Sequence, residues 1–161
     1  MKTFAGLGTK LRTLLDLLDS DLGTFEAEMG LAPYRPRYSP VVRAIVAEGP
    51  LAIRDLAANI GVTHSAASQT VAQMVRDGLV TVLPGPDARS RIVSLSDRCY
   101  ELLPLIDREW TIDETALHTL DEALPAPLLE MVDAAIRALQ EQSWLDRLRV
   151  ASASVPECDA R

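Results

Sequence analysis

The stretch that most restricts the fold of this chain is residues 62–77, VTHSAASQTVAQMVRD, which has the pattern of a short amphipathic helix. Thr63 can cap its start by accepting hydrogen bonds from the free backbone N–H groups of the first turn, and Gly78 can end it. Helical spacing gathers the apolar side chains on one stripe, with Val75 at its edge. The stripe consists of Ala67, Val71 and Met74.

The opposite stripe of this helix is polar and nearly uncharged. It consists of Ser65, Ser68, Gln69, Ala72, Gln73 and Arg76. A helix face that meets only water usually carries Lys and Glu, whereas small hydroxyls beside two Gln suit a surface in close contact with hydrogen-bonding groups. An ordinary amphipathic helix with a quiet outer face is the alternative, and this stretch alone does not decide between the two.

Length and composition limit what such a helix can belong to. With 161 residues, 48% hydrophobic and 4% aromatic, the chain suits one domain with a core of Leu, Val, Ile and Ala, which favours helices. No apolar run approaches the roughly 20 residues needed to cross a bilayer, and MKTFAGLGTK at the start does not resemble a signal peptide. Two cysteines far apart in sequence agree with a reducing compartment. We therefore expect a cytoplasmic protein with no membrane partner.

The net charge of −7 taken alone argues against nucleic acid as a partner, but the distribution of charge along the chain does not. Residues 35–91 hold seven Arg and four acidic residues, a local charge of +3. The rest of the chain holds nine basic and nineteen acidic residues, a charge of −10. A basic face on an acidic body is therefore compatible with the sequence.

The N-terminal segment predicts a long amphipathic helix. Leucines and other apolar residues recur every three or four positions over residues 6–29, and Gly30 can close the helix. A leucine face of this length exceeds what one short neighbour can cover, so we expect it to pack on a second subunit as well as on its own. A helix lying across a monomeric core is the alternative.

Two shorter helices are predicted to precede the pivotal one. Pro33 and Pro36 should exclude helix from the connector LAPYRPRY and hold its two Arg and two Tyr near the surface. Ser39-Pro40 then starts a helix that Gly49-Pro50 stops, and a third helix at residues 53–60 ends at Gly61. Helix, Gly-containing turn and helix make a helix-turn-helix, whose second helix can enter a DNA major groove.

The pivotal helix is followed by a predicted β-hairpin. Residues 79–83 and 91–95 read as strands, and Pro84-Gly85-Pro86-Asp87 is dense in turn residues. Asp87, Arg89 and Arg91 fall at or near the tip. A protruding arginine can reach a minor groove, where negative potential is concentrated, although a solvated loop arginine is the alternative.

The C-terminal part predicts further helices. Ser96 can cap a long helix through about Leu124, and Pro125 and Pro127 introduce a last helix. We expect the last helix and the first to form the base of an intertwined dimer. The expected buried side of the last helix consists of Leu128, Val132, Ala135, Ile136, Leu139, Leu145 and Leu148. Residues 151–161 are small and polar, typical of a disordered tail.

This order of elements resembles the MarR family of winged helix-turn-helix transcriptional regulators. The resemblance is carried by IRDLAANIGVTHSAASQTVAQMVRDGLV and by the wing PGPDARSRIVSLS, including Asp87-x-Arg89 and the run Ser94-Leu95-Ser96. It extends more loosely over nearly the whole chain. It implies a homodimer that places two recognition helices in successive major grooves of a pseudo-palindromic site.

The resemblance also implies which residues meet double-stranded DNA. Arg89 would enter the minor groove with Asp87 orienting it, and the helix would face base edges and phosphates. Positions 69 and 73 are often Arg in relatives; Gln suits the edge of adenine but carries no charge, so a shallower salt dependence is expected. The predicted DNA-binding set is Arg54, His64, Ser65, Ser68, Gln69, Gln73, Arg76, Asp87, Arg89 and Arg91.

The sequence says less about what such a regulator would sense. Many relatives bind a small aromatic or anionic effector between the dimer base and the DNA-binding lobe, which implies a site here formed by Arg35, Arg37, Tyr38, Trp110 and His118. Arg37 as a phosphate or salt-bridge residue and Trp110 as plain core are the alternative. Cys99 has only Arg98 nearby to lower its pKa, so we expect a structural cysteine. Two His without paired spacing predict no metal site and no cofactor.

We therefore expect a mainly α fold with a small β-hairpin wing, a winged helix-turn-helix with N- and C-terminal dimerisation helices. Its layout would be a dimerisation helix at 1–30, a DNA-binding lobe at 38–96, dimerisation helices at 97–150 and a tail at 151–161, all in one intertwined domain. The predicted function is a sequence-specific DNA-binding repressor released by a small molecule. A winged-helix module for protein contacts is the alternative. An enzyme is not expected, since neither a nucleophile elbow nor a phosphate-cradling Gly-rich loop is present.

Overall fold

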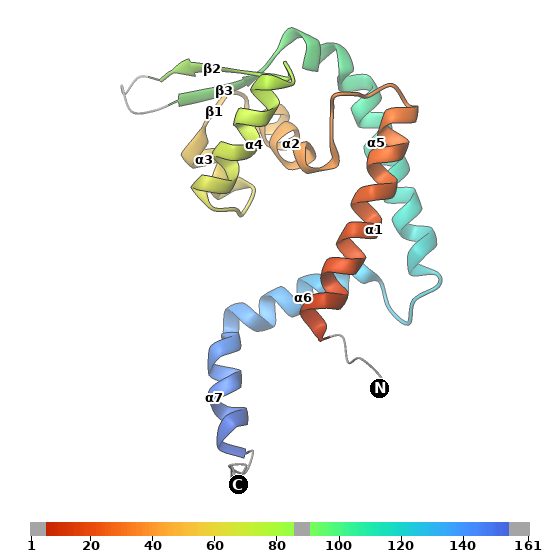
Figure 1. Cartoon of the computed structure of the whole chain (residues 1–161), viewed down its shortest axis with the longest axis vertical. Coiled ribbons are helices and arrows are strands. Elements are labelled where there is room, and N and C mark those ends of the chain that lie inside the picture. The colour runs from red at the N-terminus through yellow and green to blue at the C-terminus, as the bar shows by residue number, and fades with distance from the viewer. Residues whose placement is uncertain (1–5, 86–90, 155–161) are drawn as a thin grey trace, which may run out of the picture. The chain divides into compact units, whose positions relative to one another are not determined.

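The computed structural model describes residues 6–85 and 91–154. The chain forms two compact units, Met1–Thr111 and Ile112–Arg161. The first contains a small sheet with helices against it, and the second is helical (Figure 1). The predicted mainly α fold with a small β wing is confirmed. Along residues 6–85 and 91–154, no helix combines the length and apolar character that crossing a bilayer requires.

The first helix, α1, spans Leu7–Glu28 and ends as predicted. Gly30 has a φ of +78°, which allows the N–H of Leu31 to donate to the carbonyl of Glu26. Within the apolar stripe of α1, Leu14, Leu22 and Phe25 are half-buried. Large apolar side chains of the remaining part are exposed in the single chain: Leu7, Leu11, Leu15, Leu17 and Leu18.

The connector after α1 differs from the prediction in two ways. Pro36 does not exclude helix but starts a short 3₁₀ turn, η1 (Pro36–Tyr38), because proline fits the first position of a helical turn. The two tyrosines are not near the surface: Tyr34 and Tyr38 both lie in the core. Their rings meet edge to face with centroids 6.2 Å apart, and together with the fully buried Leu31 they anchor the connector in the core.

Three helices follow, with bounds close to the predicted ones: α2 (Ser39–Glu48), α3 (Ile53–Asn59) and α4 (His64–Arg76). Helix α2 starts at Ser39 as expected, but Ser39 does not cap it. Its hydroxyl bonds instead to the Tyr34 hydroxyl at 2.8 Å and accepts from the Trp110 indole at 3.3 Å. Ser39 therefore joins the connector to a later helix.

The sheet is one strand larger than the predicted hairpin. Strands β2 (Val80–Pro84) and β3 (Arg91–Leu95) pair antiparallel, with Val80 opposite Leu95 and Pro84 opposite Arg91. A two-residue strand, β1 (Leu51–Ala52), pairs with the other edge of β3, so the order is β1-β3-β2. Helix α4 contacts β2 and α2 contacts β3 (Figure 1). The wing is thereby fixed to the helices at its base.

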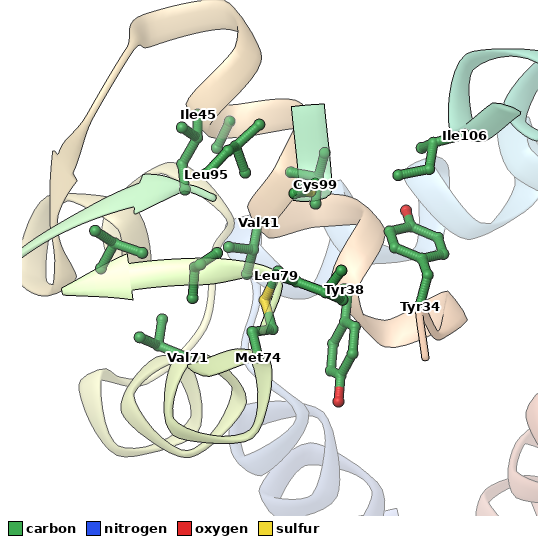
Figure 2. Packing of buried hydrophobic residues seen from close by; sticks show 14 of the residues in the cluster. Tyr34, Tyr38, Val41, Ile45, Val71, Met74, Leu79, Leu95, Cys99 and Ile106 are labelled. Carbon is green, nitrogen blue, oxygen red and sulfur yellow. The ribbon is translucent and has the colours of Figure 1, made fainter. Parts of the chain in front are cut away.

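The core of the first unit lies between these helices and the sheet. Figure 2 shows Val71 and Met74 pointing from α4 toward Leu79 and Val41, with the Tyr38 hydroxyl turned away from these apolar side chains. Cys99 is fully buried in the same cluster. The apolar stripe of α4 is thus buried in the core of the first unit, and the opposite stripe is available to contact another molecule.

The C-terminal helices are α5 (Asp97–Asp121), α6 (Leu128–Glu141) and α7 (Trp144–Ser154). Ser96 caps α5, accepting from the N–H of Cys99 at 3.1 Å and donating to the carbonyl of Gly78 at 2.7 Å. The single last helix that was predicted is wrong. The hydroxyl of Ser143 accepts from the N–H of Asp146 at 3.2 Å and donates to its carboxylate at 2.6 Å, so Ser143 caps a new helix that starts there.

One further prediction for this region needs correction. Helix α7 continues to Ser154, so residues 151–154 are helical and do not belong to a disordered tail; the remainder of that segment, 155–161, lies outside the described residues. The expected buried side of the last helix was assigned to a dimer base, and within one chain neither α6 nor α7 contains a buried residue, so its burial against a second chain stays a prediction. Leu128 is half-buried, and the other large members are exposed: Val132, Ile136, Leu139, Leu145 and Leu148.

Candidate nucleic-acid interface

Helix α4 presents one apolar and one polar face, as its sequence pattern requires. The Thr63 side chain accepts from the N–H of Ala66 at 3.2 Å and caps the helix. Ala67, Val71 and Met74 are buried. Because the buried residues fix the rotation of the helix, the polar stripe must face away from the lobe core.

The residues predicted to contact DNA have different degrees of exposure. Those with exposed side chains are Arg54, His64, Ser65, Gln69, Arg76 and Arg91. Ser68 and Gln73 are half-buried. Asp87 and Arg89 lie outside the described residues, so their proposed place at the tip of the wing stays a prediction.

The turns around α4 are built on two glycines. Gly61, between α3 and α4, has a φ of +70°, and the N–H of Val62 returns to the carbonyl of Ala57 at 3.0 Å. Gly78, after α4, has a φ of +73°, and the N–H of Leu79 returns to the carbonyl of Met74 at 2.9 Å. These turns set α3 against α4 and lead α4 directly into β2, the geometry of a winged helix-turn-helix.

A polar cluster at the C-terminal end of α4 was not predicted. The carboxylate of Asp77 accepts from the Tyr38 hydroxyl at 2.5 Å and from Nε2 of Gln73 at 3.1 Å. Nε of Arg35 lies 3.8 Å from the same carboxylate. Oε1 of Gln73 accepts from the Arg76 guanidinium at 2.5 Å. The cluster joins the C-terminal end of α4 to the connector before α2.

The electrostatics of this cluster follow from its hydrogen bonds. The pKa of Asp77 is lowered, mainly by the hydrogen bond from Tyr38 and further by those from Gln73 and the charge of Arg35, against an opposing effect of burial. The pKa of Tyr38 is raised, first by burial and then by its bond to the carboxylate. Asp77 is therefore held in the ionised form, which can only accept hydrogen bonds.

Sequence spacing could have revealed one part of this cluster. Gln73 and Asp77 are four residues apart on a helix, where side chains meet. Tyr38 is 39 residues from Asp77, and nothing in the local pattern of either residue indicates the pairing.

A cavity of about 420 Å³ lies between α1 and the connector. Its lining consists of Asp19, Gly23, Glu26, Tyr34, Arg35, Pro36 and Arg37. Tyr34, at the cavity wall, has its pKa raised to about 12, chiefly because it is buried. Two guanidinium groups and two carboxylates therefore share this space.

The structure brings together only some of the residues predicted to bind an effector. Arg35 and Arg37 line the cavity. Tyr38 is fully buried and bonded to Asp77, and Trp110 donates to Ser39 and lies under the guanidinium of Arg43, whose Cζ is 4.1 Å from the ring centroid. Both are structural within the first unit. His118 belongs to the second unit.

Metal binding and a reactive cysteine were also considered for this part of the protein. Within residues 6–85 and 91–154, no group of three His, Cys, Asp or Glu side chains is placed to hold a metal ion. Burial raises the pKa of the Cys99 thiol to about 11, so very little thiolate exists at neutral pH. This agrees with the prediction of a structural cysteine.

These elements define a winged helix-turn-helix protein with flanking helices. Residues 35–90, which contain the helix-turn-helix and the first strand of the wing, match the MarR family. The family consists of transcriptional regulators, which confirms the prediction that the chain is not an enzyme. A comparison with curated protein sequences finds no match.

Several solved structures share the fold over most of the chain. The M. tuberculosis transcriptional regulator MOSR in complex with DNA has a TM-score of 0.66 at 20% identity, covering 84% of this chain and 96% of its own. PcaV from Streptomyces coelicolor with its natural ligand has a TM-score of 0.59 at 22% identity, covering 88% and 94%. A mutant of MarR from E. coli with operator DNA has a TM-score of 0.61 at 18% identity, covering 83% and 92%.

Proposed function

We propose that this chain is a cytoplasmic transcriptional regulator that binds double-stranded DNA in a sequence-specific way as a homodimer. The observation that carries this proposal is the outward face of α4, where hydroxyl and amide side chains replace the Lys and Glu of an ordinary solvent face. Such groups are suited to base edges in a major groove. The similarity to DNA-bound MOSR and MarR supports the same function.

The proposed contacts divide into two kinds. Ser65, Ser68, Gln69 and Gln73 would lie in the major groove, where amides and hydroxyls read bases. Arg54, Arg76, Arg91 and the wing residue Arg89, oriented by Asp87, would contact the sugar-phosphate backbone or the minor groove, with His64 at the start of the helix. Since Gln69 and Gln73 carry no charge, most of the salt dependence would come from the arginines.

A homodimer is supported by the apolar side chains that one chain leaves exposed. They occupy the N-terminal part of α1 and much of α6 and α7, and include Leu15 at 58%, Ile136 at 48% and Trp144 at 59% exposure. A single chain rarely leaves so much apolar surface in water. Residues 1–30 and 97–150 would therefore dimerise around two DNA-binding lobes at 38–96, placing both α4 helices on a pseudo-palindromic operator.

We also propose that the protein is a repressor released by a small molecule. The cavity between α1 and the connector has a volume that suits a small ligand, and Arg35 and Arg37 supply positive charge to it. The carboxylates of Asp19 and Glu26 oppose a purely anionic ligand, so an aromatic molecule with both an anionic and a hydrogen-bond donor group fits best. The similar fold of PcaV with its natural ligand supports an effector.

The DNA-binding proposal is tested by selecting duplexes from a random-sequence pool and measuring affinity against salt. We expect a two-fold related sequence to be enriched and the affinity to fall as salt increases. The rival function, a winged-helix module for protein contacts, predicts neither result.

Two variants separate the two kinds of contact. Arg89→Ala should weaken binding to all duplexes, whereas Gln69→Ala should relax preference mainly at one base position, by about tenfold. Gln140→Ala, an exposed amide change on α6, is the matched control and should do neither. If Gln69→Ala instead weakens every duplex equally, its proposed role in reading a base is wrong.

A further inference from the structure

The feature that carries this inference is the pair of charged groups on either side of the Gln73 carboxamide. On one side the carboxylate of Asp77 accepts from Nε2 of Gln73 at 3.1 Å. On the other side the Arg76 guanidinium donates to Oε1 at 2.5 Å. Gln73 therefore does not project as a free side chain from the polar face of α4.

These two neighbours fix which way the carboxamide points. A carboxylate has only acceptors and a guanidinium has only donors, so each can bond to just one end of the amide. Turning the amide over would place its oxygen against the Asp77 carboxylate and its N–H₂ against Arg76, which loses both hydrogen bonds and sets like groups against each other. The amide thus has one favoured orientation.

Asp77 is itself held by residues from the connector. The Tyr38 hydroxyl donates to Oδ2 and Arg35 lies beside it, so the other oxygen, Oδ1, is presented to Gln73. The Asp77 side chain is 13% exposed, which limits competition from water. Asp77 ends α4, but its carboxylate is held in place by residues of the connector, which lie outside that helix.

The fixed orientation has a consequence for recognition. After its two internal bonds, the carboxamide of Gln73 retains one N–H and one oxygen lone pair. Adenine presents an acceptor, N7, beside a donor, the N6 amino group, in the major groove. A carboxamide that cannot turn over offers its donor and acceptor in one order, whereas a free one can adapt to other edges.

We propose that Asp77 is a positioning residue for base readout, which holds the Gln73 carboxamide in the single orientation that selects one base pair per half-site. This inference rests on the proposed function, since it takes the outward face of α4 to lie in a major groove. It adds a specificity determinant that does not touch DNA itself.

The test compares Gln73→Ala, Asp77→Asn and the control Asp107→Asn, an equal charge change at an exposed position of α5. The probe is the duplex best enriched by the wild type and its single base-pair variants, measured by fluorescence anisotropy at one salt concentration. Gln73→Ala should lose about tenfold discrimination at one position of each half-site. Asp77→Asn should lose most of the discrimination at that same position and keep it elsewhere, because an asparagine amide can both donate and accept.

Two results would overturn this inference and leave the proposed function standing. One is an Asp77→Asn protein that keeps its preference where Gln73→Ala loses it, and the other is a loss spread equally over all positions. If the wild type enriches no duplex, the proposed function falls and this inference falls with it. Asp107→Asn should leave every preference unchanged, which separates positioning from charge.

A second measurement needs neither a variant nor DNA. In ¹⁵N-labelled wild-type protein, the side-chain N–H₂ signals of Gln73 should shift with pH along the titration curve of Asp77, because protonation removes the negative charge of the acceptor and weakens the hydrogen bond. The side-chain signals of Gln140, which is exposed on α6, should not follow that curve. Gln73 signals that stay constant while Asp77 titrates would also refute the positioning role, even if Asp77→Asn failed to fold.

Discussion

Replacing Tyr38 by Phe tests the contact that joins the connector to the recognition helix. Tyr38 is 0% exposed, and Phe retains the packing of its ring, so the change removes mainly the hydrogen bond to Asp77. A hydrogen bond to a charged group contributes about 1.5–3 kcal/mol to stability. Because Gln73 and Arg35 remain beside the carboxylate, we expect the lower part of this range, a loss of about 1.5–2 kcal/mol in the free energy of unfolding.

The pH dependence of this loss follows from the lowered pKa of Asp77. Its pKa in the folded protein lies below the ordinary value of an unfolded chain, so its ionised form stabilises the fold. That stabilisation is fully present above about pH 4 and is lost as the pH falls through the folded-state pKa. Tyr38→Phe removes the largest cause of the lowering. The difference between the two proteins should therefore be greatest near pH 7 and shrink below about pH 4.

The assay is urea unfolding at several pH values, at one fixed protein concentration, because a dimer's stability depends on concentration. The matched control is Tyr100→Phe, which removes the hydroxyl of a tyrosine that is 53% exposed. It should change stability by less than about 0.5 kcal/mol. A similarly small effect of Tyr38→Phe at pH 7, or one that stays constant down to pH 3, would refute the reasoning.

Two further predictions concern other parts of the molecule. In a Cys158→Ser background, Cys99 should resist thiol reagents at pH 8 in the folded protein, because burial raises its pKa to about 11. It should react once the protein is unfolded. Rapid reaction without denaturant would contradict this prediction. Leu15→Glu should shift the protein toward monomer at micromolar concentration, as measured by light scattering, since Leu15 is on the exposed apolar part of α1; Thr13→Glu is the control, and equal masses for the two would count against the dimer.

Local patterns in the sequence were sufficient to predict the recognition helix. The spacing of Ala67, Val71 and Met74 gave its buried face, and the positions of Thr63 and Gly78 gave its ends. Helical period, caps and left-handed glycines act over a few residues, so one sequence contains them completely. The same holds for the paired strands of the wing.

Features that depend on distant residues were missed. Strand β1 has two residues and exists because an edge of β3 is available, which no local pattern records. The burial of Tyr34 and Tyr38 was predicted wrongly because a proline-rich connector has the composition of a surface loop. The Tyr38–Asp77 contact is of the same kind. The break before α7 could have been predicted from the sequence, because Ser143 and Asp146 have the spacing of a helix N-cap and its third residue.

Helix α6 contains no buried residue in the single chain, although leucine, isoleucine and valine occur along its length. A segment of this kind gains little from folding alone, and in the proposed dimer its order would depend on how often two chains meet. Newly made chains at low abundance would then expose cleavable backbone to proteases, while paired chains would survive. The cellular lifetime of the protein would rise with its own expression level, which makes gene dosage part of how sharply such a regulator responds.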